Sequence, residues 1–195
     1  DVGAFLQTNT NIFDTSQVTV WGDSLSDSAF PPDLSRLLGV TVHKEAIPGQ
    51  TSIQIAMREG GTPISITLAG NEIAAGSNFV SAVSGDLLST SADRIARAVK
   101  GSIDGIAGTL NEDGNNNYTF TPDDTHLAAT SIAPNSAFVI DNGTLNDGTV
   151  IIWAGRNNYQ SPAQVESDIA NMVAHLGANT HYLVLSVLNS DDANE

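Results

Sequence analysis

The sequence predicts an α/β protein whose α/β part is interrupted by a β-rich unit. Near both ends of the 195-residue chain, short β-branched runs alternate with segments of helical period, which is typical of parallel strand–helix–strand units. Between them, residues 60–148 are rich in Gly, Ser, Thr, Asn and Asp, and their apolar residues recur at a period close to two. Hydrophobic residues make up 41% of the chain and charged residues 15%, so the chain can bury a core.

Three apolar runs are expected to be buried strands, because they are short, β-branched and followed by turn-forming residues. They are residues 18–21, 149–153 and 182–187, and a further strand is expected at 40–46.

The clearest helix is predicted at 162–177, where Ser161 suits the cap and Pro162 the first turn. Its apolar residues fall on one face: Val165, Ile169, Met172, Val173 and Leu176. Shorter helices are expected at 33–38 and 52–58.

The middle of the chain is predicted to be a small β-sandwich, because residues such as Ile64, Ile66 and Leu68 alternate with polar ones. A helix over 86–100 is the alternative, since its apolar residues also permit a 3.6-residue period. The chain therefore divides into a first α/β part (1–59), an inserted β-rich unit (60–148) that could bind carbohydrate, and a continued α/β part (149–195).

The charge balance excludes several classes of partner. Twenty-two acidic and seven basic residues give a net charge of −15, which opposes binding to nucleic acids and to anionic membranes. No apolar run approaches the about 18 residues that a membrane span needs. The chain has no cysteine, so disulfides, thiolate metal sites and a cysteine nucleophile are excluded. Any nucleophile must be an oxygen or a nitrogen.

The sharpest local motif is Gly22-Asp23-Ser24-Leu25-Ser26-Asp27-Ser28, directly after the first predicted strand. A serine at the carboxyl end of a parallel strand projects into the crevice where α/β sheets bind ligands. This position suits the nucleophile of an acyl transfer. The alternative is that Asp23, Ser24 and Ser26 only cap a helix and fill a turn.

Two later segments leave predicted strands in the same way. Gly49 follows the strand at 40–46, and Arg156, Asn157 and Asn158 follow the strand at 149–153. Because these strand ends would open on one rim, a glycine N–H and an asparagine amide could stabilise an oxyanion beside the serine. Arg156 could meet a carboxylate or hydroxyl of the substrate, so we expect it to bind substrate.

These three segments resemble the conserved blocks of the GDSL, or SGNH, hydrolases. The resemblance implies Ser24 as the nucleophile and the Ser24 N–H, the Gly49 N–H and the Asn157 side chain as the oxyanion hole. It also implies a flavodoxin-like three-layer α/β/α core and esterase, lipase or carbohydrate-deacetylase activity, with no cofactor and no metal. Asn158 departs from the family, which has aspartate there.

The family's Asp-x-x-His block, which supplies the general base, is absent after Asn157. Asp123-Asp124-Thr125-His126 has the spacing but precedes the asparagine block, so we interpret it as a coincidence. The other histidines, at positions 43, 175 and 181, are expected to be structural or exposed. The α/β part is therefore expected to be truncated before this block, with the catalytic Asp and His in a C-terminal fragment or a companion chain.

The function expected from the resemblance is a serine esterase that removes O-acyl groups, above all acetyl, from a polysaccharide. The composition also resembles phage tail-spike and secreted bacterial deacetylases, which implies an extracellular or virion-associated protein and leaves a homo-oligomer open. The alternative from another class is a non-catalytic carbohydrate-binding or structural module on a degenerate hydrolase scaffold.

Overall fold

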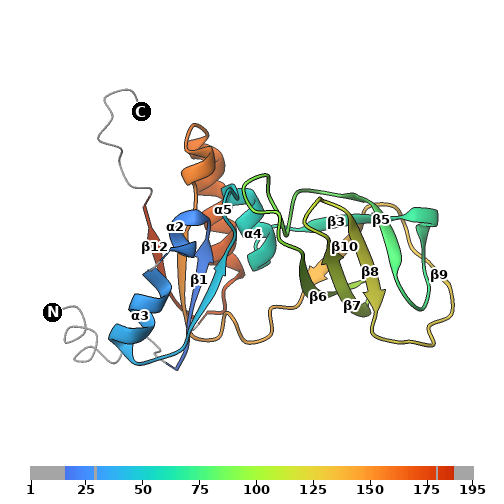
Figure 1. Ribbon diagram of the computed structural model, residues 1–195, viewed down its shortest axis with the longest axis horizontal. Coiled ribbons are helices and arrows are strands. Elements are labelled where there is room, and N and C mark those ends of the chain that lie inside the picture. Colours follow the sequence, from blue (N-terminus) through green and yellow to red (C-terminus); the bar gives the residue numbers. More distant parts are fainter. Residues whose placement is uncertain (1–15, 29, 179, 187–195) are drawn as a thin grey trace.

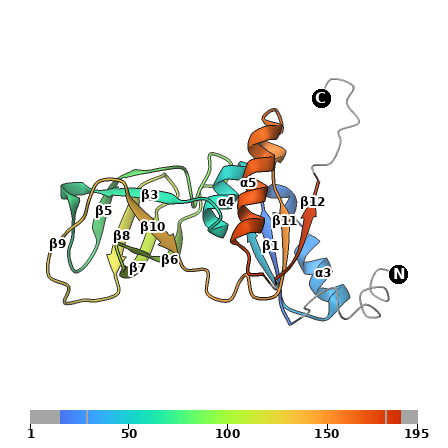
Figure 2. The ribbon, with the colours of Figure 1, turned by 180° about the vertical axis from the view of Figure 1, so that it is seen from behind.

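The computed structural model describes residues 16–28, 30–178 and 180–186, and shows two parts lying side by side (Figure 1). One part contains a parallel sheet with helices, and the other is a β-barrel. Figure 2 shows the same division from behind.

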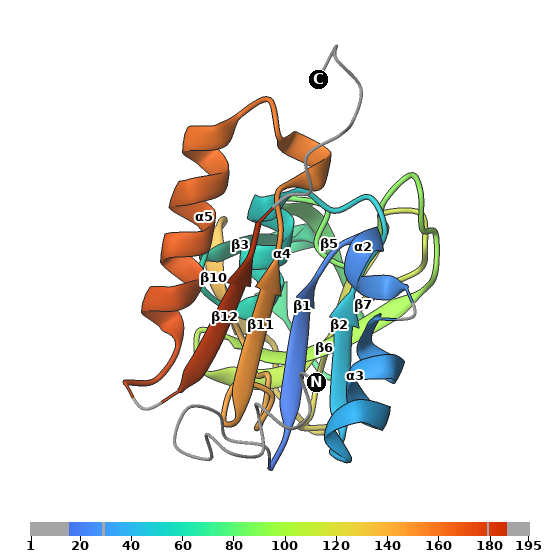
Figure 3. The same cartoon turned by 90° about the vertical axis from the view of Figure 1, so that its left-hand side faces the viewer.

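The parallel sheet has the strand order β12-β11-β1-β2 (Figure 3). These strands are β1 (Val18–Gly22), β2 (Val42–Ala46), β11 (Thr149–Trp153) and β12 (His181–Leu185). All of its neighbouring strands pair in parallel, as the alternation of strands and helices predicts. The strand predicted at 182–187 forms as β12, but its predicted burial is wrong: β12 lies at the edge of the sheet, and Tyr182, Leu183 and Val184 are 49%, 39% and 43% exposed. Residue 187 lies outside the described residues.

Helices pack on both faces of this sheet. On one face, α4 (Ser52–Glu59) and α5 (Pro162–His175) join a buried cluster that includes Trp21, Ile152 and Met172. On the other, α3 (Phe30–Leu38) packs against Val18, Val20 and Ile151, and the short α2 (Ser24–Asp27) follows β1 directly. The carboxyl ends of β1, β2 and β11 are thereby fixed by packing from both sides.

Six strands between α4 and β11 form a closed antiparallel barrel in the order β10-β3-β5-β8-β7-β6. They are β3 (Ile64–Leu68), β5 (Asn78–Val83), β6 (Arg97–Ile103), β7 (Ile106–Glu112), β8 (Tyr118–Pro122) and β10 (Ser136–Ile140). A small separate sheet pairs β4 (Glu72–Ile73) with β9 (Thr130–Ser131), and β4 follows a single 3-10 turn, η1 (Ala69–Asn71). Apolar side chains such as Ile66, Leu110 and Phe120 fill the barrel.

The predicted fold class is therefore wrong. The chain is β-rich, its largest sheet is a closed six-stranded antiparallel barrel and its helices are few, so it is not a flavodoxin-like three-layer α/β/α core with a sandwich-like insertion. Alternating apolar residues mark strands with one buried face, but they do not show whether the sheet closes on itself or packs on a second sheet. Closure depends on β10, which pairs with both β3 and β6.

The alternative of a helix over 86–100 is also wrong. This segment is a loop with an isolated bridge between Thr90 and Asp93, followed by the start of β6. Leu87 and Leu88 are both buried, whereas Ile95 is 60% exposed, so the apolar residues do not share one helical face.

Candidate functional site

The three predicted site segments leave the parallel sheet at the same edge. Gly22, the last residue of β1, is in register with Ala46 of β2 and with Trp153 of β11. Because the three strands are parallel and their last residues are in register, the loops that follow them start side by side. Ser24, Gly49 and Asn157 lie within four residues of these ends.

The turn after β1 requires glycine at position 22. A Cβ there would lie 2.0 Å from Ser26 Oγ and 2.7 Å from the Trp153 carbonyl oxygen. Asp23 caps α2 by accepting a hydrogen bond from the Leu25 N–H at 3.0 Å. Ser24, the first residue of α2, is exposed, and its side chain makes no hydrogen bond within the described part of the chain.

Asp23 is almost fully buried beside this serine, with 1% of its surface exposed. Burial raises the pKa of its carboxyl group, while the Leu25 N–H and the positive charge of Arg156 act in the opposite direction. Arg156 also lies over the Tyr159 ring, with its Cζ 5.9 Å from the ring centroid. The charge of Arg156 therefore acts on the loop that carries Ser24.

Gly49 lies in a tight turn after β2 with φ +84°, a conformation that favours glycine. The turn is held by the Gln50 N–H, which donates to the Ile47 carbonyl at 3.2 Å. From the barrel side, the Thr90 hydroxyl donates to the Pro48 carbonyl at 2.5 Å. The barrel thus contacts the turn that presents the Gly49 N–H.

Asn157 belongs to a single 3-10 turn, η2 (Arg156–Asn158), which follows Gly155 at φ +111°. Its Nδ2 donates to the Gln50 carbonyl at 2.8 Å, so the structure joins the loop after β11 to the loop that contains Gly49. A primary amide has two N–H groups, and this bond uses one of them. The other N–H is therefore available to a ligand.

Asn158 lies between the same two loops. Its Oδ1 accepts from the Ser52 N–H at 3.0 Å and its Nδ2 donates to Ser52 Oγ at 2.8 Å. The Ser52 hydroxyl in turn donates to the buried carboxylate of Asp168 at 2.6 Å. This chain of bonds ties the start of α4 to α5.

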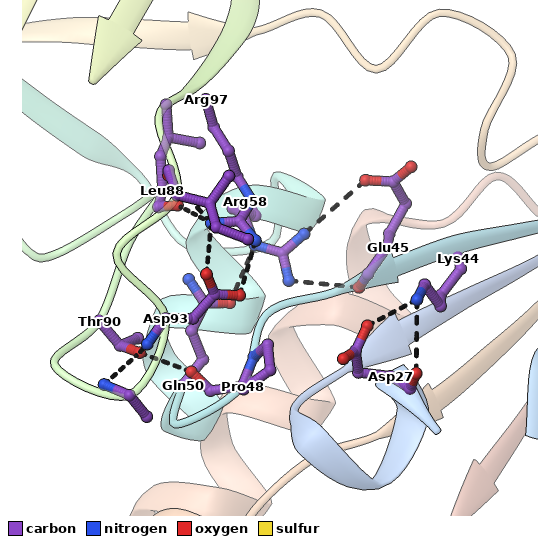
Figure 4. A network of polar contacts seen from close by, with 12 residues as sticks. Asp27, Lys44, Glu45, Pro48, Gln50, Arg58, Leu88, Thr90, Asp93 and Arg97 are labelled. Atoms are coloured by element: carbon purple, nitrogen blue, oxygen red, sulfur yellow. Dashed lines mark hydrogen bonds and ion pairs between the residues drawn. The ribbon is translucent and has the colours of Figure 1, made fainter. Parts of the chain in front are cut away.

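A buried polar network that the sequence analysis missed supports the Gly49 turn (Figure 4). Gln50 is fully buried; its Nε2 donates to the Leu87 carbonyl at 2.8 Å, and its Oε1 accepts from Arg58 Nε at 2.9 Å. Arg58, 5% exposed, also donates to the Glu45 carbonyl at 3.2 Å. Nothing local distinguishes a buried Gln or Arg from an exposed one, so only the packing of the barrel against α4 reveals this network.

Burial lowers the pKa of the Arg58 guanidinium to about 10, and Glu45 partly offsets this effect. Arg58 is therefore still a cation at neutral pH. Its Cζ lies 5.3 Å from the centroid of the Trp21 ring, which adds a cation–π contact.

None of the four histidines, all within the described ranges, lies at this edge. His43 and His181 pair with Thr19 and Thr149, in the amino-terminal halves of their sheet neighbours. His175 lies at the end of α5, with its Nδ1 3.1 Å from Glu59 Oε1. His126 follows β8 in the barrel, where its N–H donates to Asp124.

A polar cavity of about 320 Å³ borders the site. It extends from Gly49 to two barrel loops, one containing Ser89 and Arg94 and the other Asn116. In the part of the chain that the structure describes, no group of three or more His, Asp or Glu side chains could hold a metal ion. None of its helices is long and apolar enough to cross a membrane.

Comparisons of the chain with protein-family models, with curated proteins and with solved structures found no match.

Proposed function

We propose that the chain is a serine esterase of the GDSL/SGNH type that hydrolyses O-acyl esters, above all O-acetyl esters, on a polysaccharide. The observation that carries the proposal is that Ser24, Gly49 and Asn157 follow three parallel strands whose carboxyl ends are in register. Asn157 also donates a hydrogen bond to the carbonyl of Gln50, the residue after Gly49. A hydroxyl nucleophile and several N–H donors on one edge are the groups that acyl transfer needs.

In this mechanism Ser24 Oγ attacks the ester carbonyl carbon and forms a tetrahedral intermediate. The N–H groups of Ser24 and Gly49 and the second N–H of Asn157 stabilise its oxyanion. The C–O bond to the sugar then breaks, the sugar oxygen takes a proton, and the acyl group remains on Ser24. Attack by water releases the acid and restores the serine. Arg156, beside this loop, would contact the substrate.

The base that takes the proton from Ser24 would come from a C-terminal fragment or a companion chain that supplies Asp and His. Support for this comes from the placement of the histidines in the described ranges, none of which lies at the Ser24 edge.

The polar cavity beside Gly49 supports a carbohydrate rather than a long acyl chain as the neighbour of the ester. Its wall has only glycines and polar or charged side chains, whereas an alkyl chain would need apolar surface. An extracellular or virion-associated location follows from such a substrate and is part of the proposal.

The test is the hydrolysis of nitrophenyl acetate by the longest native form of the protein, compared with its Ser24→Ala and Ser28→Ala variants. Ser28 is an exposed serine of the same turn, whose hydroxyl donates to the Leu25 carbonyl. We expect Ser24→Ala to lose turnover to background and Ser28→Ala to retain it. Equal rates in all three proteins would contradict the proposal.

A second candidate function is a carbohydrate-binding module on an inactive scaffold, which is favoured by the absence of a histidine at the Ser24 edge among the described residues. Saturable glycan binding, without turnover that depends on Ser24, would support this candidate against catalysis.

A further inference from the structure

The cavity beside Gly49 has the size and position of a substrate subsite. Its volume of about 320 Å³ is at the lower end of the range for small-ligand pockets. One end is formed by Gly49, whose N–H would contact the oxyanion, and the other by loops of the barrel. A group bound there would therefore lie against Gly49, between the candidate site and the barrel.

Several side chains of its wall are already held in place. The Ser89 hydroxyl donates to Asn116 Oδ1 at 3.1 Å, which joins the two barrel loops. Gln54 Nε2 donates to the Asp86 carbonyl at 3.0 Å, which joins α4 to the first of these loops. A polar wall fixed in this way can bind a hydroxyl-rich ligand with little loss of side-chain entropy.

Arg94 is the exception in this wall, because its guanidinium makes no hydrogen bond or ion pair with any of the described residues. Five other cations of the chain form ion pairs: Arg36 with Asp33, Lys44 with Asp27, Arg58 with Glu45, Arg97 with Asp93, and Lys100 with Asp123. In a chain with 22 acidic and seven basic residues, an unpaired arginine is unexpected.

The backbone that carries Arg94 is held on both sides. Thr90 and Asp93 form a bridge before it, and Asp93 pairs with Arg97 at 2.7 Å. A Cβ on Gly114 would lie only 2.5 Å from the Arg94 carbonyl oxygen, so the second barrel loop packs closely against this residue. Arg94 is therefore anchored at its backbone, while its charged end has no partner among the described residues.

We infer that the cavity binds a carboxylate-bearing sugar unit, a uronic acid, of the esterified polysaccharide, and that Arg94 binds its carboxylate. This inference rests on the proposed function. A guanidinium presents two parallel N–H groups to a carboxylate, which gives both charge and direction. Asp86 in the same wall can accept hydrogen bonds from sugar hydroxyls. A dianionic phosphate would need more than the single arginine of this wall to neutralise it.

The test is calorimetric titration of the full-length Ser24→Ala protein with trigalacturonate and with the neutral galactotriose at low ionic strength. We expect trigalacturonate to bind at least tenfold more tightly than galactotriose. Adding Arg94→Gln should remove this preference, and Arg94→Lys should restore part of it. Arg36→Gln is the matched control, since Arg36 is also an exposed arginine but pairs with Asp33.

Equal affinity for the two sugars, no binding of either, or a preference that survives Arg94→Gln would overturn the inference. The proposed function is tested separately, because nitrophenyl acetate has no carboxylate. An otherwise native protein with Arg36→Gln should hydrolyse it at the native rate, whereas Ser24→Ala should not.

Discussion

Asn158 and Ser52 are joined by two hydrogen bonds, one from the Ser52 N–H to Asn158 Oδ1 and one from Asn158 Nδ2 to Ser52 Oγ. The Ser52 hydroxyl has a single proton and donates it to Asp168 at 2.6 Å, so it can only accept from position 158. Asparagine supplies that donor, and an ionised aspartate does not. The asparagine at position 158 therefore fits the residues around it.

Asn158→Asp should destabilise the protein by about 1–3 kcal/mol at pH 7, because it leaves the buried Ser52 oxygen facing a second carboxylate. The loss should shrink near pH 4, where a protonated aspartate can donate again. Urea unfolding at both pH values measures the effect. Asn171→Asp, on the exposed side of α5, is the control and should change little. A loss that is equal at both pH values would contradict the explanation.

Gly49→Ala should destabilise the protein and slow ester hydrolysis. The new Cβ would lie 2.9 Å from Thr90 Oγ1 and 3.0 Å from Ala92 Cβ, at a backbone φ of +84°. The strain at positive φ alone costs on the order of 1 kcal/mol. Gly76→Ala has a similar φ of +88° with nothing within 4 Å, so it measures that strain without the contacts. Thermal unfolding of both variants should show the larger loss of stability for Gly49→Ala. Equal losses of stability would show that the contact with the barrel does not restrict position 49.

Arg58→Met should cost about 1–3 kcal/mol, because it leaves the buried Gln50 Oε1 without its hydrogen-bond donor. It should also slow ester hydrolysis, since Gln50 adjoins Gly49 and accepts from Asn157. Arg36→Met removes an exposed arginine and should change the free energy of unfolding by less than about 0.5 kcal/mol. Denaturant unfolding of the two variants makes the comparison, and similar losses would show that the buried network does not stabilise the fold.

Ionisation of the Glu59 carboxyl group should lower the free energy of unfolding as the pH rises from 4 to 7. Burial raises the pKa of its carboxyl group, and contacts with His175, Gly61 and Asn146 only partly offset this. Because the folded pKa lies above the unfolded one, the stabilising contribution is complete below the ordinary value of 4.5 and is lost as the pH passes through the folded value.

The measurement is the free energy of unfolding against pH for the native protein and for Glu59→Gln. The native protein should lose stability relative to the variant over this interval. His175, the titratable side chain in contact with Glu59, is present in both proteins. Glu166→Gln, at an exposed position of α5, should leave the pH profile unchanged. A native protein that gains stability relative to Glu59→Gln would refute the assignment.

The sequence by itself determined the features that depend on short stretches of chain. The apolar runs that form β1 and β11 and the helical stripe of α5 are visible as local periodicity. The glycines that allow the turns at the candidate site are equally local, because Gly49 and Gly155 adopt positive φ values that other residues rarely tolerate.

Only the tertiary structure decided how these pieces meet. The same alternation suits a sandwich or a barrel, and the pairing of β10 with strands distant in the sequence closes the barrel. The bond from Asn157 to Gln50 and the burial of Arg58 join residues from separate loops and helices. Such contacts depend on the relative placement of whole elements, which the free energy of packing sets and no local pattern encodes.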